Sequence, residues 1–143
     1  VTEQSKDNPV FYVQYAHARI SSVINKLKKT NMNIDLTNFD NCNFSLLDKE
    51  GEIELIKILL DWKSVIETAV NLYEPHRISY YLYDLSSSFH SLWNQGKIDK
   101  NNKFIDEERP EISNVRIALL IATQETLKSG LSLIGVSAPD EMQ

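Results

Sequence analysis

The hydrophobic positions of this chain recur at helical spacing in several separate segments. The clearest segment carries apolar residues at steps of three or four: Ile78, Leu82, Leu85, Phe89 and Leu92. Such steps keep these side chains on one face of a helix. We therefore expect an amphipathic helix over about 75–95, with Pro75 in its first turn and Gly96 at its end.

The N-terminal part of the chain predicts one helix followed by a connector. Pro9 suits the first turn of a helix, with Asp7 or Asn8 as its cap, and the helical pattern runs to about Lys29. Residues 30–50 are rich in asparagine and aspartate and lack a sustained apolar period. This composition favours a loop.

Three more helices are expected further along the chain. One runs over about 52–62 and a second over 65–72, with a bend between them. The last runs over about 112–129 and is ended by Gly130, after which the apolar tail 131–136 should pack back on the helices. No stretch alternates with the period of two that marks a strand. The sequence predicts an all-α fold, a bundle of about five helices.

Length and composition favour one domain that lies outside a membrane. A chain of 143 residues can bury a sizeable core. Its single cysteine, Cys42, excludes an internal disulfide and fits a reducing compartment. No apolar run approaches the roughly 20 residues that cross a bilayer. We expect a cytoplasmic monomer and, because the chain begins with Val1, a piece of a longer protein.

The net charge of -5 argues against indiscriminate binding to nucleic acid, and we expect no DNA partner. A local site is still compatible with this total. Lys26, Lys28 and Lys29 follow Arg19 closely, which concentrates positive charge at one end of the first helix. Those lysines either contact phosphates or form a solvated helix end that interacts with the helix dipole.

Tyr15 and Arg19 lie one helical turn apart on the same side of the first helix. A tyrosine offers an aromatic face for stacking, and an arginine adds a permanent charge and planar hydrogen-bond donors. Together they can hold an unstacked base. The alternative is an amphipathic core helix with an arginine on its surface.

Catalytic and metal-binding motifs are not found in the sequence. His17, His76 and His90 are far apart and lack the spacing of metal ligands. We expect a packing or hydrogen-bonding role for His17. The four glycines cannot be assembled into a phosphate-binding loop. The chain taken alone is therefore not expected to be a catalyst.

Three blocks of sequence span nearly the whole chain. They are FYVQYAHAR at 11–19, the stretch from EPHRI to FHSLWN at 74–94, and GLSLIGVSAPDEM at 130–142. In this order they resemble the first helix, the central helix and the C-terminal signature of a known domain, the DALR-type anticodon-binding domain at the C-terminus of arginyl-tRNA synthetases.

The resemblance implies a class I synthetase that uses ATP, with magnesium, to attach arginine to arginine tRNA in protein synthesis. Its catalytic signature segments have no counterpart here. We therefore expect residues 9–143 to be the anticodon-binding domain and residues 1–8 to be a remnant of the junction to the absent catalytic domain of the same polypeptide. The fragment itself should bind the anticodon loop, hold no cofactor and lack ligase activity.

The resemblance also implies which residues bind the anticodon loop: Tyr15, Arg19, Phe89, Trp93 and Met142. Phe89 and Trp93 are again one turn apart, so two helices would each offer a pair to one pocket. Phe89 stands where some members of the family have tyrosine, and it lies in the middle of the apolar stripe. It either stacks on RNA or belongs to the core.

A helical module that binds another protein through its aromatic stripes is the alternative function. Salt dependence discriminates the two, because RNA binding releases counterions from phosphates and an apolar protein interface does not. A related domain of another synthetase would keep the tRNA role and change the amino acid.

Overall fold

The computed structural model of the chain describes residues 8–142. Its elements are five α-helices and two short 3-10 helices, in the order α1 (Pro9–Lys28), η1 (Phe44–Leu46), α2 (Glu50–Leu60), α3 (Trp62–Asn71), α4 (His76–Ile98), η2 (Lys100–Asn102) and α5 (Pro110–Leu133). The predicted all-α fold is confirmed, and residues 8–142 contain no strand. The predicted junction remnant lies, apart from Asn8, outside the described residues.

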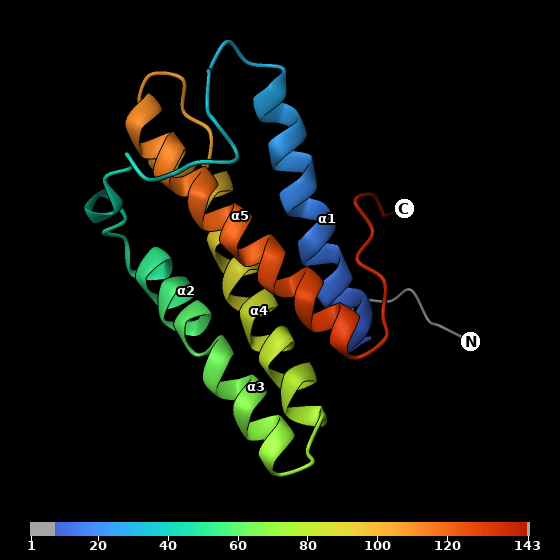
Figure 1. The fold of residues 1–143 in the computed structure, drawn as a ribbon. Helices are drawn as coiled ribbons and strands as arrows, with labels where there is room; N and C mark the ends of the chain where they lie inside the picture. Colours follow the sequence, from blue (N-terminus) through green and yellow to red (C-terminus); the bar gives the residue numbers. More distant parts are fainter. Residues whose placement is uncertain (1–7, 143) are drawn as a thin grey trace.

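The helix α4 lies at the centre of the bundle and contacts each of the other α-helices (Figure 1). α2 and α3 follow one another along one side of α4, and α1 lies on its other side, while α5 crosses in front (Figure 1). Leu82, Leu85 and Phe89 have no exposed surface. The apolar stripe predicted for this helix is therefore the centre of the core.

Local chemistry explains where α1 begins. The side-chain oxygen of Asn8 accepts hydrogen bonds from the backbone N–H groups of Val10 and Phe11, at 3.0 and 3.5 Å, and so caps α1. Asp61 alone separates α2 from α3, at the predicted bend.

Three side chains of the connector between α1 and α2 each accept a hydrogen bond from the backbone N–H two residues further on: Asp35, Asn38 and Asn43. These local turns give the connector its shape.

Two glycines that were expected to end helices lie inside them. α4 starts one residue after Pro75, and both α4 and α5 continue past their glycines. A Cβ built on Gly130 would lie 2.4 Å from Cδ2 of Leu82, so the missing side chain lets α4 and α5 approach closely. A Cβ on Gly96 would lie 3.1 Å from the backbone oxygen of Asn102. Close packing, and not helix termination, is the role of these glycines.

A buried ion pair joins α2 to α5. Nε of Arg116 donates to Oε2 of Glu52 at 2.8 Å, and both side chains are only 2% exposed. Nη1 of the same arginine donates to the backbone oxygens of Asn101 and Lys103, at 2.9 and 2.8 Å. Arg116 therefore fixes the loop between α4 and α5 from inside the protein.

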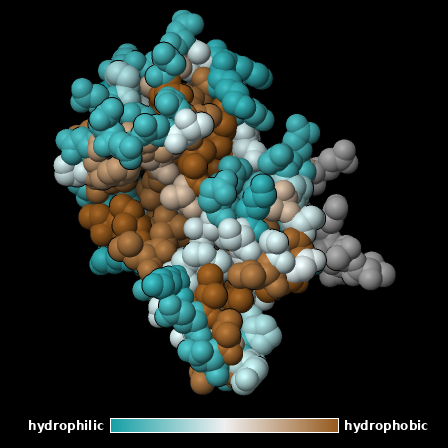
Figure 2. Space-filling view, in the orientation of Figure 1, coloured by the Kyte–Doolittle hydropathy of each residue, from teal (hydrophilic) through white to brown (hydrophobic). Residues whose placement is uncertain are grey.

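Apolar side chains are exposed on the face that carries η1, α2 and α3 (Figure 2). They include Phe44, Ile53, Leu60, Val70 and Leu72. Exposed apolar side chains on one face favour contact with another protein over contact with RNA, which needs basic surface.

Candidate nucleic-acid interface

The helices α1 and α4 and the C-terminal tail surround a pocket of about 610 Å³. Tyr15 and Arg19 from α1, Trp93 from α4 and Met142 from the tail all line it. Figure 1 shows the tail running beside α1. The fold thus brings together side chains that are far apart in the sequence, as the resemblance implied. Phe89, the fifth predicted residue, is not among the side chains that line this pocket.

The guanidinium of Arg19 lies against two aromatic rings. Its Cζ is 4.4 Å from the ring centre of Tyr15 and 5.0 Å from that of Trp93. Both distances are in the range of cation–π attraction. Nη2 donates to the hydroxyl of Tyr15 at 3.2 Å, and Nη1 lies 2.9 Å from Nδ1 of His90. These contacts hold the planar charge at the wall of the pocket.

Trp93 rests on a pair of phenylalanines. Its ring centre is 6.3 Å from that of Phe89 and 6.3 Å from that of Phe104, and those two rings stack at 6.1 Å. Phe89 is 0% exposed because it occupies the middle of the apolar stripe of α4. It supports Trp93 from the core and does not line the pocket, so of the two predicted roles the structure favours core packing. The indole Nε1 of Trp93 is buried without a hydrogen-bond partner among the described residues.

Three polar side chains of α1 hold the C-terminal tail. Gln14 Nε2 donates to the oxygen of Ser137 at 2.9 Å, His17 Nδ1 bonds the oxygen of Pro139 at 2.9 Å, and Ser21 Oγ donates to Oδ1 of Asp140 at 3.0 Å. The hydrogen-bonding role expected for His17 is confirmed. Sequence reasoning missed that these side chains form one tail-binding stripe. Their spacing of three and four residues, which places them on one face of the helix, is the signal that could have found it.

Positive charge surrounds the pocket although the whole chain is acidic. The cationic side chains that line it are Arg19, Lys26, Lys29 and Lys97. The carboxylates that line the pocket are those of Asp140 and Glu141, and Asp140 already accepts a hydrogen bond from the hydroxyl of Ser21. Nζ of Lys97 lies 5.8 Å from the ring centre of Trp93. Cations beside aromatic rings suit a ligand with phosphates and bases.

His90 lies behind Arg19 and is uncharged at neutral pH. Burial lowers its pKa from the ordinary value of 6.5 to about 4, and the charge of Arg19 lowers it too. The backbone oxygen of Tyr12, 3.4 Å from Nε2, acts in the opposite direction. A neutral imidazole can accept a hydrogen bond, which a protonated one cannot.

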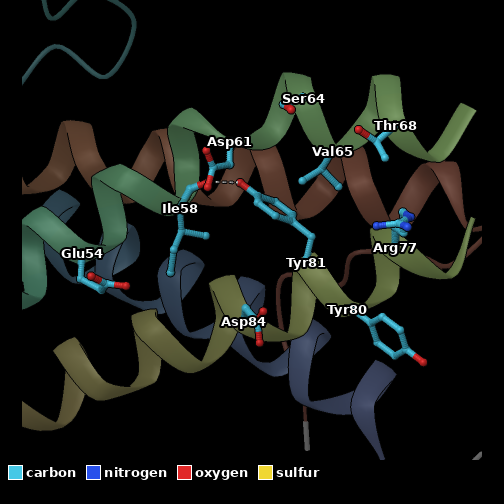
Figure 3. Close-up of a pocket in the computed structure, with 10 residues that line it drawn as sticks. All are labelled: Glu54, Ile58, Asp61, Ser64, Val65, Thr68, Arg77, Tyr80, Tyr81 and Asp84. Atoms are coloured by element: carbon cyan, nitrogen blue, oxygen red, sulfur yellow. Dashed lines mark hydrogen bonds between the residues drawn. The ribbon is translucent and has the colours of Figure 1, made fainter. Parts of the chain in front are cut away.

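A second pocket, of about 560 Å³, lies between α4 and the pair α2 and α3 (Figure 3). Its charged side chains are three carboxylates, of Glu54, Asp61 and Asp84, and one arginine. The hydroxyl of Tyr81 donates to the backbone oxygen of Ile58 at 2.6 Å, as Figure 3 shows. Burial raises the pKa of Tyr81, and the neighbouring Asp61 raises it further. Because carboxylates repel phosphates, this pocket is the poorer candidate for RNA.

Two other kinds of functional feature are not found in residues 8–142. They contain no group of three or more histidine, cysteine, aspartate and glutamate side chains placed to hold a metal ion. Within the same residues no helix is long and apolar enough to cross a membrane. The basic aromatic pocket of α1, α4 and the tail is therefore the candidate site that the structure supports best.

The sequence model of one family, the DALR anticodon binding domain, matches residues 13–142. The chain belongs to this family. The family resemblance that the three sequence blocks carry is thereby confirmed. The match covers all of α1 except its first turn, and it ends at Met142, which lines the pocket.

Relatives with high similarity to this chain are arginine–tRNA ligases. The ligase of Beijerinckia indica is 50% identical over the whole chain, and that of Rickettsia akari is 45% identical over 99% of it. The structure of Thermus thermophilus arginyl-tRNA synthetase superimposes with a TM-score of 0.71 over 99% of the chain, at 26% identity. The chain spans 25% of the length of each of these two ligases and 22% of the Thermus chain.

Proposed function

We propose that this chain binds the anticodon loop of arginine tRNA, as the C-terminal part of an arginine–tRNA ligase. The family match over residues 13–142 and the ligases among its relatives support this function. The observation that carries it is the pocket itself. Two aromatic rings, Tyr15 and Trp93, and the charged plane of Arg19 meet there, although Trp93 comes from a different helix.

Recognition of an unpaired base follows from the chemistry of these side chains. A base from the splayed loop stacks on Tyr15 or Trp93, and each such stack is worth about 1–3 kcal/mol. Arg19 donates hydrogen bonds to acceptor atoms on the base edge. Met142 adds apolar contact from the side of the tail.

The lysines at the rim of the pocket contact the RNA backbone. Lys26, Lys29 and Lys97 are exposed and line the pocket. Flexible ammonium groups suit phosphates as point charges, whereas the planar Arg19 suits a base. This division confines the electrostatic attraction to one site, and the acidic remainder of the chain limits binding to other nucleic acids, DNA included.

The ligase reaction belongs to the catalytic domain of the same polypeptide in this proposal. That domain uses ATP, with magnesium, to activate arginine, and residues 9–143 contribute tRNA binding alone. The polypeptide acts in the cytoplasm, and this domain contacts its RNA as a monomer.

A pair of matched substitutions tests the proposed function. Arg19→Ala should weaken binding of the full chain to an anticodon stem-loop of arginine tRNA by about 1–3 kcal/mol, because it removes the base contact. Arg77→Ala removes an arginine of the acidic pocket and should leave the affinity unchanged. Equal affinities of the two variants, measured by fluorescence anisotropy at fixed salt, would overturn the proposal.

The exposed apolar face over α2 and α3 favours the second candidate function, a protein-binding module. Titration with salt separates the two functions. Affinity for the stem-loop should fall steeply as salt rises, since each phosphate contact releases counterions. Affinity for a protein partner at an apolar interface would change much less with salt.

A further inference from the structure

The hydrogen bonds of Arg19 define which form of His90 is present. A guanidinium only donates hydrogen bonds, so Nδ1 of His90, 2.9 Å from Nη1, must carry a lone pair and no proton. The other ring nitrogen, Nε2, faces the backbone oxygen of Tyr12 at 3.4 Å. A carbonyl oxygen only accepts, so the proton belongs on Nε2. Both contacts select the same neutral tautomer.

The imidazole of His90 has little freedom to turn. The side chain is 6% exposed. Its ring centre lies 4.6 Å from that of Tyr12, 5.5 Å from that of Phe89 and 5.7 Å from that of Tyr15. These rings come from both α1 and α4, so the packing of the two helices fixes the direction in which Nδ1 points.

His90 does not itself line the pocket, whereas Arg19 and Tyr15 do. Any effect of His90 on a ligand must therefore pass through these two side chains, and Arg19 is the one that His90 holds by a hydrogen bond. A free arginine side chain samples many rotamers, and ordering it on binding reduces the affinity. An acceptor that orders Arg19 in advance removes that loss.

We propose that His90 is a positioning residue of the RNA-binding site, which sets the orientation of the Arg19 guanidinium through the unprotonated Nδ1. The proposal rests on the proposed function of the pocket. Nη1 uses one hydrogen on His90 and Nη2 one on Tyr15, which leaves the other N–H donors of the guanidinium for a ligand. His90 thus selects which edge of the guanidinium meets the base.

Two amide substitutions separate a positioning role from a merely structural one. Asparagine places its amide oxygen where Nδ1 stands, so His90→Asn can still accept from Arg19. Glutamine places its amide near Nε2, so His90→Gln can still reach Tyr12 but offers no acceptor at the Nδ1 position. Neither variant carries the imidazole ring, so both lose its packing.

Affinity for the arginine anticodon stem-loop is the first readout. We expect His90→Asn to bind within about threefold of the parent chain and His90→Gln to bind about tenfold more weakly, the loss typical of one hydrogen bond to a charged group. In an Arg19→Ala background His90→Asn and His90→Gln should bind equally, because the group that His90 positions is gone. Equal affinities of the Asn and Gln variants in the parent chain, or the same difference between them in the Arg19→Ala background, would overturn the proposal.

A second readout needs no RNA. The side-chain N–H signals of Arg19 in nuclear magnetic resonance spectra should be resolved in the parent chain and in His90→Asn, and averaged by rotation in His90→Gln. Unchanged Arg19 signals in His90→Gln would overturn the positioning role. If the parent chain failed to bind the stem-loop, the proposed function would fall, and these signals would still decide whether His90 orders Arg19.

Discussion

Nδ1 of His17 lies 2.9 Å from the backbone oxygen of Pro139. His17 is in the middle of α1 and is 3% exposed, whereas Pro139 belongs to the tail that follows α5. The bond joins two parts of the chain that are 122 positions apart. It holds the tail along α1, and the tail carries Met142 to the pocket. Side-chain hydrogen bonds therefore complete the candidate site.

Loss of this bond should loosen the tail. His17→Phe keeps a ring but removes the donor, so the oxygen of Pro139 loses its partner. We expect backbone amides of residues 136–142 to exchange with deuterium roughly three- to tenfold faster, the effect of one hydrogen bond of about 1 kcal/mol. Hydrogen exchange followed by mass spectrometry measures this, with α2 and α3 as the internal reference. Unchanged exchange in the tail would contradict the role given to His17.

The buried ion pair between Glu52 and Arg116 should make a large contribution to stability. Glu52→Ala leaves the guanidinium of Arg116 buried without its counter-charge, which typically costs about 3–5 kcal/mol of the free energy of unfolding. Glu67→Ala is the matched control, because its partner Lys63 is 88% exposed and such pairs contribute less than about 1 kcal/mol. Urea unfolding compares the two variants. Equal losses would show that the buried pair has no special role.

The sequence predicts the helices well because each has a local cause. The cap at Asn8, the bend at Asp61 and the apolar stripe of α4 depend on neighbouring residues alone. The prediction that Gly130 ends a helix is wrong, because the contact that requires a glycine there is with Leu82, which is distant in sequence. The sequence alone does not distinguish a glycine that ends a helix from one that lets another helix pack closely.

The sequence predicts only part of the candidate site, because some of its residues come together only in the folded chain. Tyr15 and Arg19 share a helix face, so their spacing reveals them. Trp93 and Met142 join them only through tertiary contacts, and only the family resemblance indicated them. The burial of Phe89 and the tail-binding role of His17 depend on which helix faces are covered. Composition and periodicity do not contain that information.

The lowered pKa of His90 predicts how stability changes with pH. In the folded chain its pKa is about 4, and in the unfolded chain it returns to the ordinary 6.5. Between these values the unfolded state binds more protons than the folded state, so the contribution of His90 to stability falls as the pH is lowered from 6.5 to 4. His90→Asn lacks this titration.

Urea unfolding at several pH values gives the comparison. The free energy of unfolding of the parent chain should fall more between pH 6.5 and pH 4 than that of His90→Asn. Parallel pH profiles would mean that His90 is not buried as a neutral imidazole. Other titrating groups are the same in both chains, so the difference between the profiles reports His90.

The two tryptophans of the chain offer a direct test of where RNA binds. Trp93 lines the basic pocket, whereas Trp62 stacks on Tyr81, which lines the acidic pocket, with ring centres 5.1 Å apart. Each indole N–H gives its own signal in nuclear magnetic resonance spectra, so one titration reports both regions at once.

The decisive measurement is a titration of the full chain with the anticodon stem-loop of arginine tRNA, following both indole signals. Stacking of a base in the pocket predicts that the Trp93 signal shifts in proportion to binding while the Trp62 signal stays in place. A shift of Trp62 without a shift of Trp93, or binding that moves neither signal, would contradict the assignment of the anticodon site to the pocket of Tyr15, Arg19 and Trp93.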